Sequence, residues 1–253
     1  MKLLCLHGAY GNAEGFKIQL SPFLNAVGDI KDLDFKWING THVVVPPEGY
    51  ESYFGNQELY RFFNFDGLDA LDDVLLKVRD MPGGDSAEEA IRKLVQGAPL
   101  SSESIHETID RLFQIMDEDP EIDGVLGYSE GATVAATLLL EEQRRVAEEG
   151  RERQLRMGVF FSGWPPLILR NGQFVPFLAD ESEDVLEIPT LHIVGSKDPY
   201  IDGAMALLNL CDQDSAILFD HGKGHTLPRD MRTLKELTIA MDGALSLTGQ
   251  RVS

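Results

Sequence analysis

The chain has 253 residues with 42 acidic and 22 basic side chains, which give a formal net charge of −20 and a pI near 4.6. This length is typical of one large α/β domain, here expected to span residues 1–253. A chain with this negative charge repels nucleic acids and anionic membranes, so neither is expected as a partner. Two cysteines, Cys5 and Cys211, suit neither a disulfide framework nor a metal cluster, and no apolar run reaches transmembrane length. We therefore expect a soluble, cytoplasmic protein without a bound metal.

The N-terminal part of the chain has the pattern of a strand, a turn, a helix and a second strand. Residues 2–6 form a short apolar run that predicts a buried central strand, and a Gly-rich turn follows at His7-Gly8-Ala9-Tyr10-Gly11-Asn12. Residues 16–27 have helical apolar spacing, although Pro22 should start or interrupt a helix there. Residues 42–45 predict the second strand, which Pro46-Pro47 would stop.

Residues 46–100 have a different character and are too long for a simple connection between a strand and a helix. Helical patterns near residues 68–78 and over residues 87–95 flank a loop at Met81-Pro82-Gly83-Gly84-Asp85. The segment predicts a lid-like insertion over the face where ligands bind. Its aromatic residues are expected to line an acyl or aryl pocket on one side and to pack as a small core on the other: Tyr50, Tyr53, Phe54, Tyr60, Phe62, Phe63 and Phe65.

The remainder of the chain alternates strands with helices. Ser101 is an N-cap candidate for a helix that carries apolar residues at three- and four-residue spacing as far as Met116. Residues 167–187 have a loop-like pattern. Further strands are predicted at residues 124–128, 157–162, 191–194 and 215–219, and helices at residues 131–149, 204–210 and 229–247. This order predicts an α/β fold with a mostly parallel central sheet of about six strands and helices on both faces.

A nucleophile elbow is predicted where the strand at residues 124–128 meets the next helix. Gly127-Tyr128-Ser129-Glu130-Gly131 matches G-x-S-x-G in the setting of strand, sharp turn and helix that this motif requires. The two glycines leave room for the turn, and the new helix directs free N–H groups at the serine. The pentapeptide alone also fits a tight turn whose serine only caps the helix, so the rest of the chain must decide.

Two further residues complete a catalytic triad in the chain order of an α/β-hydrolase. Ser129, Asp198 and His225 occur in this order, each just past a predicted strand, and the carboxyl ends of parallel strands meet at one edge of the sheet. A serine hydroxyl needs an imidazole to take its proton, and the imidazole needs a carboxylate to orient it. Such chemistry uses no metal and no organic cofactor.

Other residues compete for these roles. His221 could be the base in place of His225, although it directly follows a strand and is better suited to a structural position. Asp202 competes with Asp198, and either could be an exposed turn carboxylate. His192 alternates within a strand, which predicts a core histidine.

The oxyanion hole requires two backbone N–H groups aimed at the developing negative charge. One is expected from Glu130, directly after the nucleophile, and the other from Ala9, with Tyr10 as the alternative. His7 is expected to brace this turn rather than to take part in the chemistry. The candidates for substrate contact are Tyr10, Tyr53, Phe54, Tyr128 and Trp164.

Taken together, these motifs resemble the FSH family of serine hydrolases, which are compact α/β-hydrolases of eukaryotes. The resemblance spans nearly the whole chain, and Arg61-Phe62-Phe63 is similar to an arginine-aromatic-aromatic motif in the family's insertion. Glu130 replaces a common glutamine, which keeps the backbone N–H but adds a charge near the pocket, and residues 66–97 are long for the family. The motifs keep their order: Leu4-Cys5-Leu6-His7-Gly8, Gly40-Thr41-His42, Gly127-Tyr128-Ser129-Glu130-Gly131-Ala132, Ser162-Gly163, Gly195-Ser196-Lys197-Asp198 and Gly224-His225.

The resemblance implies hydrolysis of a carboxylic ester or an acyl thioester through an acyl-enzyme. Fungal members of this kind resemble thioesterases encoded with polyketide synthases, which release an acyl chain from a carrier protein. The implied partners are therefore a small-molecule ester or a carrier-protein-bound acyl thioester, together with a polyketide synthase. Two alternatives stay open: a catalytically silent binding module with this fold, and an acyltransferase or cyclase that uses the same triad.

Overall fold

The computed structural model describes residues 1–46, 57–64, 84–96, 101–182 and 185–249. Two candidates for substrate contact, Tyr53 and Phe54, and the helix predicted near residues 68–78 lie outside the described residues. None of the described helices is long and apolar enough to cross a membrane.

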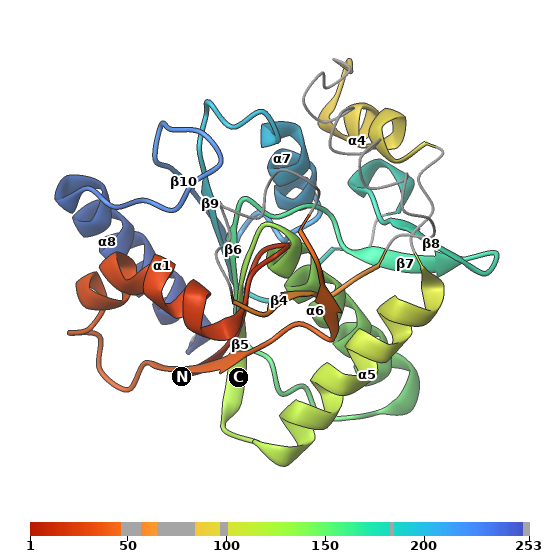
Figure 1. Cartoon of the computed structure of the whole chain (residues 1–253), viewed down its shortest axis with the longest axis horizontal. Helices are drawn as coiled ribbons and strands as arrows, with labels where there is room; N and C mark the ends of the chain where they lie inside the picture. Colours follow the sequence, from red (N-terminus) through yellow and green to blue (C-terminus); the bar gives the residue numbers. More distant parts are fainter. Residues whose placement is uncertain (47–56, 65–83, 97–100, 183–184, 250–253) are drawn as a thin grey trace.

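A six-stranded sheet forms the centre of the molecule, with the strand order β10-β9-β6-β5-β1-β2 (Figure 1). All five pairs of neighbouring strands are parallel. The predicted parallel sheet of about six strands is therefore confirmed. The strands are β1 (Lys2–Leu6), β2 (Asp34–Ile38), β5 (Ile122–Tyr128), β6 (Gly158–Phe161), β9 (Thr190–Val194) and β10 (Ala216–Asp220).

Helices cover both faces of this sheet because side chains alternate along each strand. Leu3 and Cys5 of β1 pack with α1 (Ala13–Ala26) and α8 (Met231–Thr248), which lie side by side in Figure 1. Leu4 and Leu6 point to the opposite face. That face packs against α5 (Ser102–Glu118), α6 (Glu130–Glu149) and α7 (Ile201–Asn209).

The strand predicted at residues 42–45 forms, but it does not belong to the central sheet. It is β3 (His42–Val44), which pairs antiparallel with β4 (Leu59–Arg61) in a separate two-stranded sheet. The place beside β1 is taken by β2, which was not predicted. β2 is an edge strand with exposed Asp34 and Lys36, so it lacks the continuous apolar run of a buried parallel strand.

Two further local predictions were incomplete. α1 begins at Ala13 and continues through Pro22. Pro22 has no N–H to donate to the Ile18 carbonyl, and the Ser21 hydroxyl donates to this carbonyl instead (2.8 Å). Residues 167–187 are not all loop, because β7 (Leu167–Arg170) and β8 (Gln173–Pro176) form a hairpin. Its turn is Asn171-Gly172, with φ of 52° and 79°, and Asn-Gly is a strong hairpin signal that the sequence interpretation missed.

Other predicted helices form close to their expected bounds. The pattern over residues 87–95 becomes α4 (Ala87–Val95), which contacts α7. Ser101 caps α5, and its hydroxyl accepts from the Ser104 N–H (3.4 Å).

Candidate active site

Ser129 occupies a sharp turn between β5 and α6, with φ 53° and ψ −119°. A residue other than glycine is strained in this region, at a cost of about 1–3 kcal/mol. A Cβ on Gly127 would lie 2.3 Å from the Gly131 carbonyl oxygen, and a Cβ on Gly131 would lie 2.2 Å from that of Leu6. Both positions therefore require glycine. The turn is held by the Ser129 N–H, which donates to the carbonyl of Phe161 on β6 (2.9 Å).

The structure brings Ser129, His225 and Asp198 together in one hydrogen-bonded chain. His225 Nε2 lies 3.1 Å from Ser129 Oγ, and His225 Nδ1 lies 2.8 Å from Asp198 Oδ2. A carboxylate only accepts, so Nδ1 carries the proton and donates to Asp198. Nε2 is then free to accept from the Ser129 hydroxyl. This is the tautomer that general-base catalysis requires.

Asp198 is almost fully buried, with 4% of its surface exposed. Burial raises the pKa of the carboxyl, but hydrogen bonding and charge from His225, the Tyr200 N–H and the Ser162 hydroxyl outweigh it, so the pKa lies below its ordinary value. The Tyr200 N–H donates to Asp198 Oδ1 (2.9 Å). The carboxylate is thus held ionised and in a fixed orientation toward His225.

The loops that carry Asp198 and His225 touch through their backbones. A Cβ on Gly195 would lie 2.0 Å from the Lys223 carbonyl oxygen, and the Lys197 N–H donates to the same carbonyl (3.0 Å). The Asp198 N–H donates back to the Gly195 carbonyl (2.8 Å). Only glycine at position 195 allows this close approach of the loops after β9 and β10.

Two tyrosines fix the plane of the His225 ring. Tyr128 stacks on it with ring centroids 5.4 Å apart, and Tyr200 meets it edge-on at 4.8 Å. The Tyr128 hydroxyl donates to the His225 carbonyl at 3.5 Å, at the limit of a hydrogen bond. These contacts limit rotation of the imidazole away from Ser129.

The alternatives for base and acid do not make these contacts. His221 is buried, and its Nδ1 has no hydrogen-bond partner among the described residues. Burial lowers the pKa of His221. Asp202 lies in the first turn of α7 and makes no hydrogen bond to a histidine in the described part of the chain. His192 is buried within β9, where Nε2 lies 3.0 Å from the Thr190 hydroxyl.

One expected oxyanion donor, Glu130, directly follows Ser129, and the other, Ala9, follows Gly8, where an added Cβ would lie 3.5 Å from Ser129 Cβ. Glu130 is the first residue of α6, so its N–H has no acceptor within the helix. Ala9 lies in the Gly8–Gly11 turn, which the Gly11 N–H closes onto the Gly8 carbonyl (3.1 Å). Tyr10 in this turn has a φ of 55°.

His7 braces the turn that carries Ala9. Its Nε2 accepts from the Gly40 N–H (2.9 Å), and its Nδ1 donates to the Gly8 carbonyl (2.7 Å). Both ring nitrogens are therefore used in holding the backbone. Burial lowers the pKa of His7, which keeps the ring neutral as this pattern requires.

The side chain of Glu130 binds Arg61 of β4. Arg61 Nε donates to Glu130 Oε2 (2.8 Å), and the Phe62 N–H donates to Glu130 Oε1 (2.8 Å). The Arg61 and Glu130 side chains are only 8% and 9% exposed. The Arg61 guanidinium also lies over the Tyr10 ring, 5.6 Å from its centroid. The expected extra charge near the pocket is therefore neutralised, and Arg61 links the elbow to the Ala9 turn.

A cavity of about 500 Å³ opens beside His225, and only part of the expected substrate contacts line it. Ala9, Tyr10 and Tyr128 are in its wall, together with Arg229. Trp164 is not in this wall, because it packs on Gly203 of α7 and lies 6.2 Å from Tyr200 between ring centroids. Sequence patterns did not single out Arg229, since only the folding of the chain brings it to this cavity.

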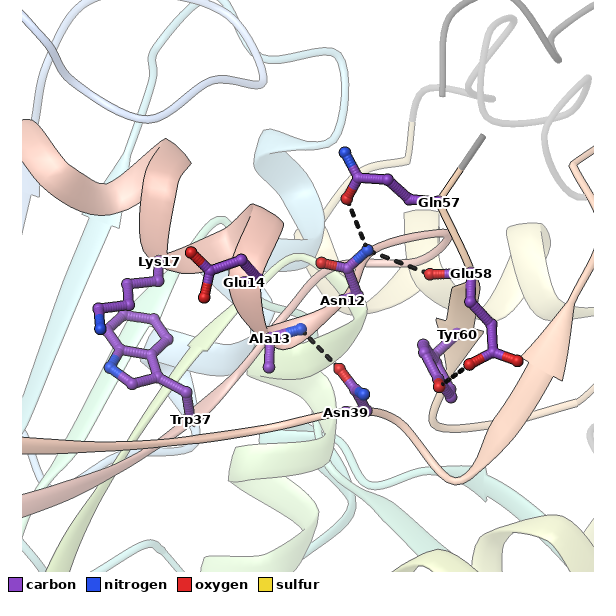
Figure 2. A pocket seen from close by; sticks show the side chains of 9 residues that line it. All are labelled: Asn12, Ala13, Glu14, Lys17, Trp37, Asn39, Gln57, Glu58 and Tyr60. Carbon is purple, nitrogen blue, oxygen red and sulfur yellow. Dashed lines mark hydrogen bonds between the residues drawn. The ribbon is translucent and has the colours of Figure 1, made fainter. Parts of the chain in front are cut away.

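A second cavity, of about 470 Å³, shares Asn12 and Gln57 with the first. Figure 2 shows that the Asn12 amide donates to Gln57 Oε1 (3.0 Å) and to the Glu58 carbonyl (3.1 Å). Asn39 accepts from the Ala13 N–H (2.8 Å) at the start of α1. The hydrogen bond between Asn12 and Gln57 therefore lies in the wall that the two cavities share.

The model of the family described as "Serine hydrolase (FSH1)" matches residues 1–237. The chain belongs to this serine hydrolase family. The match covers the elbow, Asp198 and His225, and it agrees with the resemblance inferred from the motifs. No group of three or more His, Cys, Asp or Glu side chains that could hold a metal ion occurs in the described ranges.

Fungal esterases are similar to this chain, two of the three described here over most of their length. Esterase FPY3 of Fusarium mangiferae is 26% identical over 96% of this chain and 95% of its own. Esterase FUS5 of Gibberella moniliformis is 26% identical over 98% of this chain and 86% of its own. Esterase citA of Monascus ruber is 32% identical, but over 42% of this chain and 47% of its own.

Two solved structures with a similar fold are a plant protein and a bacterial carboxylesterase. Arabidopsis thaliana SOBER1 has a TM-score of 0.57 at 15% identity, over 97% of this chain and 99% of its own. A carboxylesterase from Mesorhizobium loti has a TM-score of 0.53 at 16% identity, over 96% of this chain and 88% of its own. At this identity the likeness shows a shared α/β fold.

Proposed function

We propose that this protein is an esterase in which Ser129 is the nucleophile, His225 the general base and acid, and Asp198 the group that orients His225. The observation that carries the proposal is the unbroken hydrogen-bonded chain from Ser129 Oγ through His225 to buried Asp198, at 3.1 Å and 2.8 Å. The strained turn at Ser129 and the family membership support the same assignment.

The reaction would begin when Ser129 Oγ attacks the carbonyl carbon and passes its proton to His225 Nε2. The carbonyl oxygen gains the electron pair of the broken π bond and accepts hydrogen bonds from the Ala9 and Glu130 N–H groups. The intermediate collapses to an acyl-enzyme as His225 returns the proton to the leaving alcohol or thiol. Water then attacks the acyl-enzyme while His225 takes one of its protons. The bond from the acyl carbon to Ser129 Oγ breaks, His225 returns that proton to Oγ, and a carboxylic acid leaves.

The substrate we propose is an acyl ester or thioester of moderate size, with a carrier-bound polyketide-type acyl chain as the specific case. The cavity of about 500 Å³ beside His225 has room for an acyl chain or for part of a thiol arm. The relatives carry the names esterase and hydrolase, which support ester cleavage as the general activity. The carrier protein and the polyketide synthase remain parts of the proposal.

The test is hydrolysis of p-nitrophenyl esters and matched acyl thioesters of graded chain length. We expect Ser129→Ala to lower kcat about 10⁴-fold or more, while the fold stays intact. Ser246→Ala is the matched control, because Ser246 is an exposed serine of α8 whose hydroxyl donates to the Asp242 carbonyl (2.9 Å). Near-normal turnover by Ser129→Ala would refute the assignment. Preference for larger acyl thioesters would support chain release, and turnover limited to short oxygen esters would refute it.

A further inference from the structure

The residues that line the cavity beside His225 differ in charge from the chain as a whole. The chain has 42 acidic residues and a net charge of −20, yet none of the described residues lining this cavity is Asp or Glu. Apart from the two histidines, its one basic lining residue is Arg229. An acid-free cavity with one guanidinium is the local environment that an anionic group requires.

Arg229 is unlike the other arginines in the described residues. Each of the others forms a hydrogen bond or an ion pair within the described protein, for example Arg92 with Asp180, Arg156 with the Thr248 carbonyl and Arg232 with Glu236. Arg229 is exposed, and it makes no hydrogen bond or ion pair with any described residue. Its charge is therefore available to a ligand in the cavity.

The neighbouring carboxylate does not compete for this charge. Asp230 caps α8, where it accepts from the Thr233 N–H (3.0 Å) and the Thr233 hydroxyl (2.8 Å). Its other oxygen lies 3.3 Å from Lys223 Nζ. The carboxylate that follows Arg229 in the chain is thus already occupied by a helix N-terminus and a lysine.

We propose that Arg229 binds an anionic group of the substrate, so that this site prefers acyl esters or thioesters carrying a carboxylate or phosphate away from the scissile bond. The inference rests on the hydrolase function proposed above. Because the protein as a whole repels anions, such a substrate needs a local cation at the site. At physiological salt, charges more than about 8 Å away are largely screened, so a direct contact with Arg229 outweighs the distant acidic surface.

The first arm tests an anion on the acyl side. It measures kcat/KM for the anionic p-nitrophenyl monoester of glutaric acid and for the neutral p-nitrophenyl valerate. For each protein, the value for the anionic ester is divided by the value for the neutral ester. Arg229→Gln should lower this ratio about 3- to 10-fold, mainly through KM, and Arg229→Glu should lower it further. Both effects should shrink at high salt. Arg232→Gln is the matched control, since it removes the same charge from an exposed arginine three residues away.

The second arm tests an anion on the leaving group. It compares butyryl thioesters of 4′-phosphopantetheine and of pantetheine in the same proteins. If Arg229→Gln lowers the ratio of kcat/KM for the phosphorylated to the unphosphorylated thioester only, the anion that Arg229 binds is on the leaving thiol. If it lowers the ratio for the p-nitrophenyl esters only, the anion is on the acyl chain. If Arg229→Gln changes neither ratio, or Arg232→Gln changes them equally, the inference is wrong.

Binding without turnover separates this inference from the proposed function. Calorimetry would measure monomethyl glutarate binding to Ser129→Ala and to Ser129→Ala combined with Arg229→Gln. We expect about 3- to 10-fold weaker binding to the second protein, and no difference for neutral dimethyl glutarate. Equal binding of the monoanion would overturn the anion site even if ester hydrolysis depends on Ser129. Absence of Ser129-dependent hydrolysis would overturn the proposed function whatever the binding shows.

Discussion

Arg61 and Glu130 form a buried ion pair beside the elbow, and its partners explain why a charged residue is tolerated directly after Ser129. The Glu130 carboxylate receives the Arg61 guanidinium and the Phe62 N–H, so its negative charge is compensated where water is excluded. Such a pair adds little net stability, but removing one partner leaves the other charge buried and unpaired. The pair also connects β4 to α6, and through Tyr10 to the turn that carries Ala9.

A double-mutant cycle tests this pair. Arg61→Met should lower the free energy of unfolding by about 3–5 kcal/mol because Glu130 is left buried without its cation. Glu130→Gln should also destabilise, and the double variant should lose less than the sum of the two, with a coupling of about 1–3 kcal/mol. Denaturant unfolding of the four proteins gives these values.

Arg92→Met is the control for this cycle. Arg92 pairs with Asp180 and Glu181, but its side chain is 42% exposed, so the change should cost under about 1 kcal/mol. If Arg61→Met cost no more than Arg92→Met, the buried pair would not link the elbow to β4 as described.

At the scale of elements, the position of His225 depends on how the loops after β9 and β10 meet. The Lys223 carbonyl accepts the Lys197 N–H and lies where a Cβ on Gly195 would be. His225 follows two residues later, and Asp198 lies in the turn that begins at Gly195. The loops must therefore keep this contact for His225 to reach both Ser129 and Asp198.

Gly195→Ala should separate the two loops and reduce kcat/KM for esters by about tenfold or more, since a displacement of about 1 Å can cost 100-fold in rate. The free energy of unfolding should fall by about 1–3 kcal/mol because the new methyl group has no room. Ester kinetics and denaturant unfolding measure the two effects.

Gly243→Ala is the matched control within α8. The nearest atom to a Cβ at that position is 3.7 Å away, so the change should leave kinetics intact and stabilise the helix by roughly 0.5–1 kcal/mol. Normal kinetics for Gly195→Ala would show that the loop contact does not control the site.

At the scale of the whole molecule, His192 couples folding to pH. The side chain is buried in β9, and burial lowers its pKa from 6.5 to about 3. Between these values the unfolded chain binds a proton that the folded protein does not, so stability falls as the pH decreases from 6.5 toward 3. Above pH 6.5 both states are neutral at this residue and the effect is absent.

His192→Leu should remove this part of the pH dependence. For each protein, the free energy of unfolding at pH 4.5 is compared with its own value at pH 8. The decrease should be about 2–3 kcal/mol larger for the wild type than for the variant, because each pH unit below 6.5 contributes about 1.4 kcal/mol. Urea unfolding of both proteins from pH 4.5 to 8 provides the comparison. Parallel curves would mean that His192 becomes protonated without unfolding.

Local sequence patterns were sufficient for the α/β class, for most helices and for the positions of Ser129, Asp198 and His225. The nucleophile elbow and the Gly-rich turn after β1 depend on residues adjacent in the chain, and apolar runs identify strands that are buried on both faces. β2 was not predicted because an edge strand is polar on its exposed side. Residues 42–45 were predicted as the second strand instead because they are more apolar.

The contacts of Glu130 with Arg61 and the wall of the cavity at Arg229 depend on tertiary structure. Arg61 and Glu130 are 69 positions apart, so no periodicity links them, and they meet only because β4 packs beside the elbow. The sequence already favoured His225 over His221, and the fold adds the contacts that distinguish them. Both histidines follow β10 within five residues, and the backbone contact between two loops determines which one lies within 3.1 Å of Ser129.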